Sequence, residues 1–266
     1  LAYGGEDLKF GPEYLIPRPF DPRLIAKIAP AVADAAMRSG VATRPIINLE
    51  AYRDSLSQFV YHSGLIMKPL FAGAKESPKR IVYAEGEDER VLRALQVIVD
   101  EGLAVPIVIG RPSVVERRIE QLGLRIRAGK EFSLINPESD PRYRDYWTTY
   151  HQLTERKGVS QEYAKIEMRR RNTLIGAMMI HKGEADGMLC GTFGTYALHL
   201  GYIDQVIGLL PGVRQYAAMN ALMLPHRTVF ICDTYVTPDP TAEHIAEMTV
   251  LAAEAVRRFG LQPKVA

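Results

Sequence analysis

Short apolar segments alternate with helical patterns from residue 80 to the end of the chain, and this alternation restricts the fold more than any other feature. Strands are predicted at 80–84 (RIVYA), 105–110 (VPIVIG), 132–136 (FSLIN), 187–191 (GMLCG), 220–225 (NALMLP) and 228–232 (TVFIC). Helices are predicted at about 91–99, 114–122, 141–156, 160–181, 197–209 and 245–259. Strands separated by helices favour a mainly parallel sheet covered by helices, so we expect a three-layer α/β/α fold. The final PKVA is predicted to begin another strand.

The first 65 residues follow a different pattern. A proline-rich stretch precedes a helix that Asp21 can cap, that Pro22 can begin and that Gly40 ends. A second helix is predicted from about Asn48 to a stop at Gly64. Two helices without a strand cannot close a core of their own, so we expect them to pack on other protein.

Polar and turn-forming residues separate these helices from the alternating region. We therefore predict an N-terminal helical region at 1–67, a linker at 68–79 and an α/β domain at 80–266. Because the last predicted strand is cut short, the α/β domain is expected to be truncated at its C-terminus.

Composition excludes several classes of protein. A hydrophobic fraction of 47% and a net charge of +2 are typical of a soluble globular protein and disfavour broad nucleic-acid binding, which needs a basic face. No apolar stretch approaches the roughly 18 residues of a membrane span. The two cysteines lack CxxC spacing and nearby histidines, which disfavours a metal site or a disulfide framework and favours a reducing, cytoplasmic compartment. Because the first residue is Leu1, we expect an interior fragment of a longer protein.

The segment CGTFGT, at 190–195, is the strongest candidate for ligand binding. It lies between a predicted strand and a predicted helix, so the backbone amides of Gly191, Thr192, Gly194 and Thr195 could face an anion. A plain turn explains the glycines equally well. No Lys or Arg occurs between positions 182 and 214, whereas phosphoryl transfer needs a positive group. This indicates binding without chemistry, unless a cation arrives from elsewhere in the fold.

Two further residues are weaker candidates. Arg169 begins the run RRR and could grip a phosphate group of a nucleotide-like ligand, although a solvated helix surface explains the run as well. Asp233 lies at the end of a predicted strand, where open α/β sheets usually bind ligands. A turn followed by the capped start of a helix is the default interpretation of its segment.

The acidic segment EGEDER, at 85–90, has two interpretations. Four acids after a strand could form a metal or acid–base cluster. Acids at a helix N-terminus that complement its dipole are the favoured reading, because no histidine accompanies them.

Longer segments resemble known families. The chain from about Lys79 to its end is similar to the phosphate acetyltransferase family, and 1–67 resembles the end of the malic enzyme portion of bacterial NADP-dependent malic enzymes. The first similarity is carried by RIVYAEGEDERVLRA, INPESDPRYRDYWTTYHQLTERKGV, GAMMIHKGEADGMLCG and DTYVTPDPTAEHIAEMTVLAAEAVRRFGLQPKVA, and the second by GGEDLKFGPEYLIPRPFDPRLI. Only hybrid malic enzymes join these two pieces in this order, so the chain resembles an interior fragment of that family.

This resemblance implies a phosphate acetyltransferase-like (isocitrate dehydrogenase-like) sheet domain after two malic enzyme tail helices. Active acetyltransferases end their threonine-rich loop segment in an arginine that helps to hold phosphate, and the matching position here is Gly201. The resemblance therefore implies a domain that binds acetyl-CoA, with Gly191, Thr192, Gly194, Thr195, Arg169 and Asp233 as candidate contacts, and that inhibits the malic enzyme part. The catalytic, metal-binding and dinucleotide-binding residues are implied to lie outside the chain.

For the parent protein, the resemblance implies oxidative decarboxylation of malate to pyruvate and CO2 with NADP and Mg or Mn, in a cytoplasmic homo-oligomer. Neither nucleic acid nor membrane is an expected partner. Two alternatives stay open. One is an active phosphate acetyltransferase, which makes acetyl-CoA from acetyl phosphate and CoA, and the other is a purely structural oligomerisation module.

Overall fold

The computed structural model describes residues 23–60, 64–224 and 227–266, which form two compact units. One unit contains Leu70–Tyr216 and Thr237–Glu247, and the other contains residues up to Pro69, Ala217–Val236 and Met248–Ala266. The helices are α1 (Arg23–Arg38), α2 (Leu49–Val60), α3 (Gly64–Glu76), α4 (Glu89–Glu101), α5 (Pro112–Gln121), α6 (Tyr143–Thr154), α7 (Gln161–Arg170), α8 (Asn172–His181), α9 (Tyr196–Val206) and α10 (Ala242–Arg258), with a 3-10 turn at Glu155–Lys157. The strands are β1 (Lys79–Tyr83), β2 (Ala104–Ile109), β3 (Ser133–Ile135), β4 (Gly187–Leu189), β5 (Met219–Leu224) and β6 (Arg227–Cys232).

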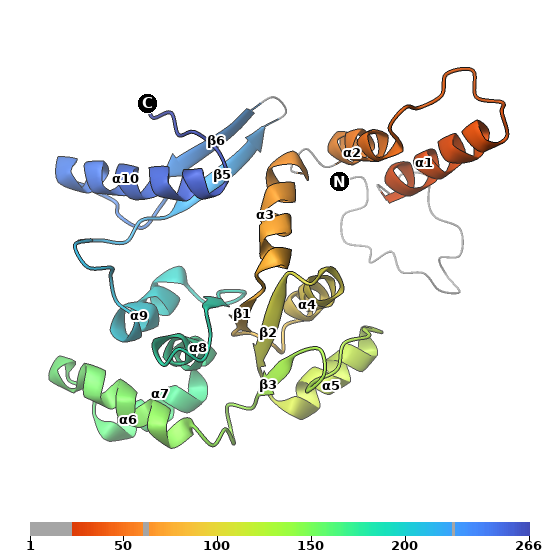
Figure 1. The fold of residues 1–266 in the computed structure, drawn as a ribbon. Coiled ribbons are helices and arrows are strands. Elements are labelled where there is room, and N and C mark those ends of the chain that lie inside the picture. The colour runs from red at the N-terminus through yellow and green to blue at the C-terminus, as the bar shows by residue number, and fades with distance from the viewer. Residues whose placement is uncertain (1–22, 61–63, 225–226) are drawn as a thin grey trace. The chain divides into compact units, whose positions relative to one another are not determined.

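The larger unit is built on a parallel four-stranded sheet in the order β3-β2-β1-β4 (Figure 1). Strand β1 lies between β2 and β4, with Val82 opposite Ile107 on one side and Met188 on the other. Parallel strands end at the same edge, so the segments that leave β1 and β4 meet at one edge of the sheet. The expected parallel sheet is therefore confirmed.

Helices cover both faces of this sheet, as the alternation of side chains along β1 requires. Val82 is fully buried on the face covered by α6, α7, α8 and α9, and the next residue, Tyr83, faces α4 and α5 (Figure 1). Leu92 and Leu95 of α4 are fully buried on this second face. The three-layer α/β/α arrangement is confirmed.

Gly86 allows the ends of β1 and β2 to approach closely. Its backbone N–H donates to the carbonyl oxygen of Ile109 at 3.0 Å. A Cβ at this position would lie 2.1 Å from Val108 Cγ1 and 2.7 Å from the Ile109 carbonyl oxygen, closer than atoms can pack. Any larger residue would therefore push the chain after β1 away from the sheet.

The predicted helix at 160–181 is wrong in one respect, because the structure divides it into α7 and α8. Arg171 has extended backbone angles (φ −121°, ψ 93°) and separates the two helices. Its side chain turns back to Glu167 at 3.1 Å, while the side chain of Asn172 donates to the carbonyl oxygen of Ala84 at 2.8 Å. This contact with the end of β1 fixes where the second helix begins.

The last two predicted strands exist but do not join the parallel sheet. β5 and β6 form an antiparallel pair in the smaller unit, with Ala221 opposite Phe230. Phe230 also makes an edge-on ring contact with Phe259, at 5.4 Å between centroids. The segment 263–266 is not a strand in the structure, which corrects the expectation for PKVA. A strand needs a neighbour to pair with, and none of the described residues pairs with this segment.

The predicted N-terminal helices are confirmed as α1, which ends where the sequence indicates, and α2, which begins where it indicates. Gly64, expected as the stop of the second helix, is instead the first residue of α3. Gly40 follows α1 with a positive φ of 74°, and the Asn48 side chain accepts hydrogen bonds from the first amides of α2. Asp21 and Pro22 lie outside the described residues. Helix α3 covers most of the stretch expected as a linker at 68–79, and the division into units falls between Pro69 and Leu70. The domain boundaries themselves stay a prediction.

We expect Gly86→Ala to lower the free energy of unfolding of the larger unit by about 1–3 kcal/mol, because the added methyl group overpacks the ends of β1 and β2. The measurement is urea unfolding followed by the fluorescence of Trp147, the single tryptophan of the chain, which lies on α6 of this unit.

Gly201→Ala is the matched control for this prediction. Gly201 lies inside α9, and a Cβ there meets nothing within 4 Å. Because alanine favours a helix over glycine, this change should raise the unfolding free energy by about 0.5–1 kcal/mol. Equal effects of the two substitutions would contradict the packing argument.

Candidate functional site

The candidate site lies where β1 and β4 end side by side. The backbone N–H of Ala84 donates to the carbonyl oxygen of Leu189 at 3.0 Å, which keeps the two strand ends together. Residues 191–195, which we name the glycine loop, follow β4 and lead into α9 (Figure 1). The predicted handover from strand to helix is therefore confirmed, and the loop lies at the edge where open α/β sheets bind ligands.

The conformation of the glycine loop explains its residue types. Gly191 and Gly194 have positive φ angles of 101° and 88°, which glycine adopts without steric cost. Thr195 caps α9, since its side chain accepts from the backbone N–H of Leu198 at 3.4 Å. Among the described residues, no acceptor receives the backbone N–H groups of residues 192–195. Four donors are thus open to a ligand or to water.

The Glu85 side chain accepts a hydrogen bond from the first backbone amide of the loop. This residue follows β1 directly, is 5% exposed, and accepts a hydrogen bond from the backbone N–H of Gly191 at 3.0 Å. The bond ties the chain after β4 to the chain after β1. It also places a carboxylate beside a loop whose amides favour negative charge.

A cation reaches the loop from a distant part of the chain, which sequence proximity could not show. The guanidinium of Arg90, in the first turn of α4, donates to the carbonyl oxygen of Thr192 at 2.9 Å. The same guanidinium pairs with Asp88 at 2.8 Å, and its side chain is 71% exposed. Arg90 therefore holds the loop backbone, while Asp88 balances its charge.

His199 supports the loop from α9. Its Nε2 lies 2.8 Å from the carbonyl oxygen of Phe193, and its Nδ1 lies 2.7 Å from Oγ1 of the buried Thr173. A carbonyl oxygen only accepts, so a neutral His199 carries its proton on Nε2 and Nδ1 accepts from the threonine hydroxyl. The ring also lies 3.1 Å from where a Cβ of Gly194 would be, so it packs against the turn of the loop.

Cys190 lies between these groups and stays a thiol. Burial raises the pKa of the Cys190 thiol, and the nearby charge of Glu85 raises it further, while its hydrogen bond with the Thr173 side chain opposes both effects. A thiol with a raised pKa is a weak nucleophile near neutral pH. We therefore assign no covalent chemistry to it.

The structure places the two weaker candidates in other roles. The Arg169 guanidinium lies over the ring of Tyr143, 4.3 Å from its centroid, and the structure describes no bond from it to the loop. Asp233 belongs to the smaller unit, where its carboxylate accepts the backbone N–H of Ala218 at 2.8 Å and that of Val236 at 3.1 Å. Both geometries are explained by packing and turn formation, and ligand roles for these residues stay predictions.

The acidic side chains after β1 mostly cap a helix or form ion pairs near a helix start, as the sequence indicated. The Asp88 side chain accepts the backbone N–H of Arg90 and caps α4, Glu89 pairs with Arg93 at 2.7 Å, and Glu87 pairs with Arg111 at 2.8 Å. Within the described ranges, no three His, Cys, Asp or Glu side chains gather to hold a metal ion.

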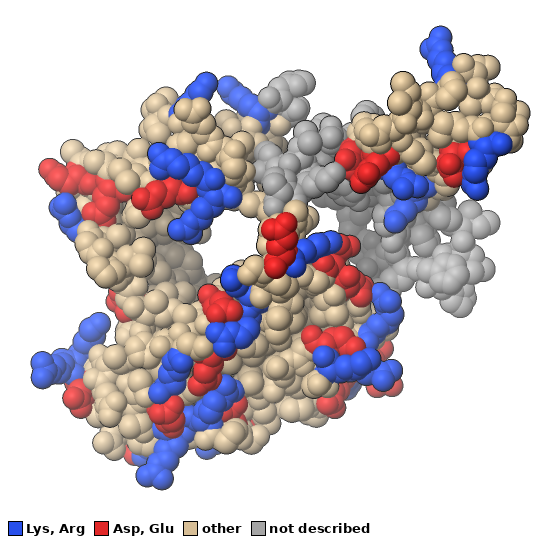
Figure 2. Space-filling model, in the orientation of Figure 1, with Lys and Arg blue, Asp and Glu red and all other residues tan. Residues whose placement is uncertain are grey.

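Charges on the surface are mixed rather than grouped. On the face shown in Figure 2, Lys and Arg lie among Asp and Glu, consistent with exposed pairs such as Arg80–Asp186 and Lys75–Glu101. No helix in the described part of the chain is long and apolar enough to cross a membrane.

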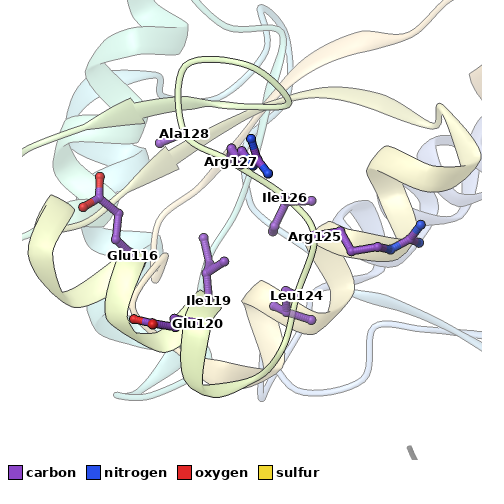
Figure 3. Close-up of a pocket in the computed structure, with 8 residues that line it drawn as sticks. All are labelled: Glu116, Ile119, Glu120, Leu124, Arg125, Ile126, Arg127 and Ala128. Atoms are coloured by element: carbon purple, nitrogen blue, oxygen red, sulfur yellow. The ribbon is translucent and has the colours of Figure 1, made fainter. Parts of the chain in front are cut away.

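A groove elsewhere in the larger unit does not compete with the loop as the site. It has a volume of about 580 Å³ and lies between α5 and the segment that follows it (Figure 3). Half of its lining residues are charged, and Arg125 already pairs with Asp100 at 2.7 Å. Small-molecule pockets are mostly apolar with few polar groups, and no residue of the strand ends or the loop lines this groove. Its lining is Glu116, Ile119, Glu120, Leu124, Arg125, Ile126, Arg127 and Ala128.

Comparison with known proteins places this geometry in a family. The family model described as "Phosphate acetyl/butaryl transferase" matches residues 65–266, which include the sheet and the glycine loop. The chain belongs to this family. A solved phosphotransacetylase from Streptococcus pyogenes has a TM-score of 0.65 and 29% identity, covering 74% of this chain and 60% of that one.

The chain is also similar over its full length to malic enzymes. It is 57% identical to the NADP-dependent malic enzyme of Salmonella typhimurium and 53% identical to the NAD-dependent malic enzyme of Rhizobium meliloti, in each case over 100% of this chain. It spans 35% and 34% of the length of these relatives. The phosphate acetyltransferase-like region of this chain thus matches a part of larger malic enzymes.

We expect His199→Phe to loosen the glycine loop, because it removes the bonds to Thr173 and to the Phe193 carbonyl oxygen. Each neutral hydrogen bond contributes about 1 kcal/mol, so the loss of two should make opening roughly thirtyfold more frequent. Phe193 is 67% exposed, so the measurement is the rate of chymotrypsin cleavage after this residue, followed by mass spectrometry under native conditions. His151→Phe on α6 is the control, and an equal rise in that variant would contradict the assigned role.

Proposed function

We propose that this chain is the acetyl-CoA-sensing part of a malic enzyme that oxidatively decarboxylates malate to pyruvate and CO2. Three observations support the proposal. The chain matches malic enzymes over its whole length, its larger unit has the phosphate acetyltransferase fold, and its glycine loop offers open backbone amides at the ligand-binding edge of the sheet. Acetyl-CoA is the proposed ligand because it is the thioester that a phosphate acetyltransferase makes.

The charges at the loop favour binding over acetyl transfer. Phosphoryl and acyl transfer develop negative charge that a positive group must stabilise. Arg90 is the cation described at the loop, and its charge is balanced by Asp88. Position 201, where the resemblance places an arginine in active acetyltransferases, is glycine. This combination is the single observation that carries the assignment to regulation.

Regulation then follows from linkage between two sites. Acetyl-CoA inhibits if it binds an inactive arrangement of the parent more tightly than the active one, and malate must then weaken acetyl-CoA binding by the same factor. The parent is proposed to use NADP with Mg or Mn at sites outside this chain, to assemble as a homo-oligomer and to act in the cytoplasm.

The test is to titrate acetyl-CoA against malate-dependent NADPH formation by the full-length parent. We expect saturating acetyl-CoA to lower the rate about 5- to 150-fold, the range of typical coupling energies of 1–3 kcal/mol. CoA without the acetyl group is the matched control ligand. An unchanged rate at saturation, with binding verified by a thermal shift, would reject regulation, and no thermal shift at all would favour a purely structural module.

An active phosphate acetyltransferase is the second candidate, and the contact between Arg90 and the loop favours it. A guanidinium that left Asp88 and turned toward a bound phosphate would supply the charge that the loop sequence lacks. This candidate predicts that the full-length parent forms acetyl-CoA from acetyl phosphate and CoA. Arg90→Lys should then lower that rate at least tenfold, since a lysine cannot reproduce the paired contacts of a guanidinium. No detectable transfer by the unmodified protein would remove this candidate.

A further inference from the structure

Helix α9 carries the far end of the glycine loop. Thr195 is both the last residue of the loop and the residue whose side chain caps α9. The bond between Glu85 and the Gly191 amide fixes only the first residue of the loop, so the position of α9 decides where the open amides of residues 192–195 point. Whatever holds α9 in place therefore also positions the candidate site.

Apolar packing holds α9 only in part. Its buried residues are Tyr202 and Val206, whereas Tyr196 at its start is 50% exposed. Hydrogen bonds add to this packing at positions three residues apart, the spacing that keeps side chains on one side of a helix. These bonds join His199 to Thr173 at 2.7 Å, Tyr202 to Glu167, and Gln205 to Tyr150 at 2.7 Å. The partners belong to α8, α7 and α6 in turn, so each helix of this layer holds α9 at a different point (Figure 1).

The bond from Tyr202 to Glu167 is the central one and is shielded from water. The two residues are 7% and 4% exposed. Burial raises the pKa of the Tyr202 phenol, and its hydrogen bond with Glu167 raises that pKa further, so the hydroxyl keeps its proton and donates it. Oε2 of Glu167 accepts this bond and also one from Nε of Arg171 at 3.1 Å. Because Arg171 separates α7 from α8, this carboxyl group links the junction of two helices to α9.

We propose that Tyr202 is a positioning residue of the candidate site, and that the hydrogen-bonded side of α9 keeps the glycine loop in the arrangement that binds a ligand. Tyr202 lies seven residues after Thr195, about 10 Å along the helix axis. A short helix moves as one body, so a tilt or rotation of α9 at Tyr202 reorients the amides at its start. The placement of the loop follows from these contacts alone, and only the ligand used in the test rests on the proposed function, that the loop binds acetyl-CoA.

The test compares Tyr202→Phe with the unmodified full-length parent. Phenylalanine keeps the ring in its apolar contacts, and Glu167 keeps its bond from Arg171, so the substitution removes only the bond between α7 and α9. We expect chymotrypsin cleavage after the exposed Phe193 to become about fivefold faster, the factor that corresponds to one hydrogen bond. The affinity for acetyl-CoA, measured by isothermal titration calorimetry, should fall by a factor of about two to five, because it scales with the fraction of molecules whose loop is in place.

Tyr143→Phe is the matched control. The Tyr143 hydroxyl donates to the carbonyl oxygen of Lys165 at 2.9 Å, a bond that joins α6 to α7 rather than to α9. Each substitution removes one hydrogen bond of a tyrosine hydroxyl in the same helical layer, so both should lower the midpoint of thermal unfolding followed by circular dichroism. Only Tyr202→Phe should change loop cleavage and acetyl-CoA affinity. A purely structural role for Tyr202 would not separate the two variants in this way.

Equal cleavage rates in the two variants overturn the inference and leave the proposed function standing. Faster cleavage in Tyr202→Phe with unchanged acetyl-CoA affinity also overturns it, because the loop then binds without this support. If the unmodified protein does not bind acetyl-CoA, the proposed function fails, and the cleavage rates alone decide the inference. If Tyr202→Phe does not fold, Tyr150→Phe takes its place, since it removes the bond to Gln205 on the same side of α9. Cleavage no faster than in Tyr143→Phe then overturns the inference.

Discussion

The hydrogen bond from the backbone N–H of Gly191 to the buried carboxylate of Glu85 fixes the geometry on which the candidate site depends. It joins the chain after β4 to the chain after β1, at the edge where both strands end. Gly86, the next residue, donates its backbone N–H to the carbonyl oxygen of Ile109 in a contact that only a glycine permits. The backbone that carries the Glu85 side chain therefore cannot easily shift. The sheet therefore sets the position of Glu85, and Glu85 sets the position of the loop.

The proposal that this loop binds a ligand without group transfer rests on the position of the charges around it. A loop that promotes transfer needs a positive group free to meet the charge that develops in the reaction. Here the guanidinium of Arg90 is held by Asp88 and by the carbonyl oxygen of Thr192. The open amides of residues 192–195 remain, so the loop keeps donors for a ligand without a cation free to assist chemistry.

The sequence predicted the parallel sheet because its strands are apolar, short and separated by helices. Val82, Val108 and their neighbours must be buried on both faces, and only a covered parallel sheet provides that. The sequence could not predict the break at Arg171, because the helical pattern is continuous there and the break is set by the contact between Asn172 and Ala84. It also placed β5 and β6 in the sheet, since a hairpin in another unit has the same apolar pattern as two internal strands.

The candidate site shows the same limit. The glycines of the loop were predictable, because two positive φ angles leave a local signal in the sequence. Arg90 and His199 were missed, because they reach the loop from helices that the fold brings to it from separate parts of the chain. Glu85 had a weaker signal, as an acid placed directly after a buried strand. Its difference from the acids beside it is the lack of a cation, which only the three-dimensional arrangement shows.

The attachment of the loop also determines how the binding of a ligand there would affect the rest of the larger unit. Thr192 is held from α4 on one face of the sheet, whereas Phe193 is held through His199 by α8 on the other face. These are contacts of side chains with carbonyl oxygens, and each can be exchanged without breaking a strand pair. A ligand that took up the loop amides would reorient these carbonyl groups and act on both helical layers at once. Coupling of this kind requires an element with two arrangements that the ligand distinguishes, and within the described residues no backbone pairing ties the amides of residues 192–195 to one arrangement.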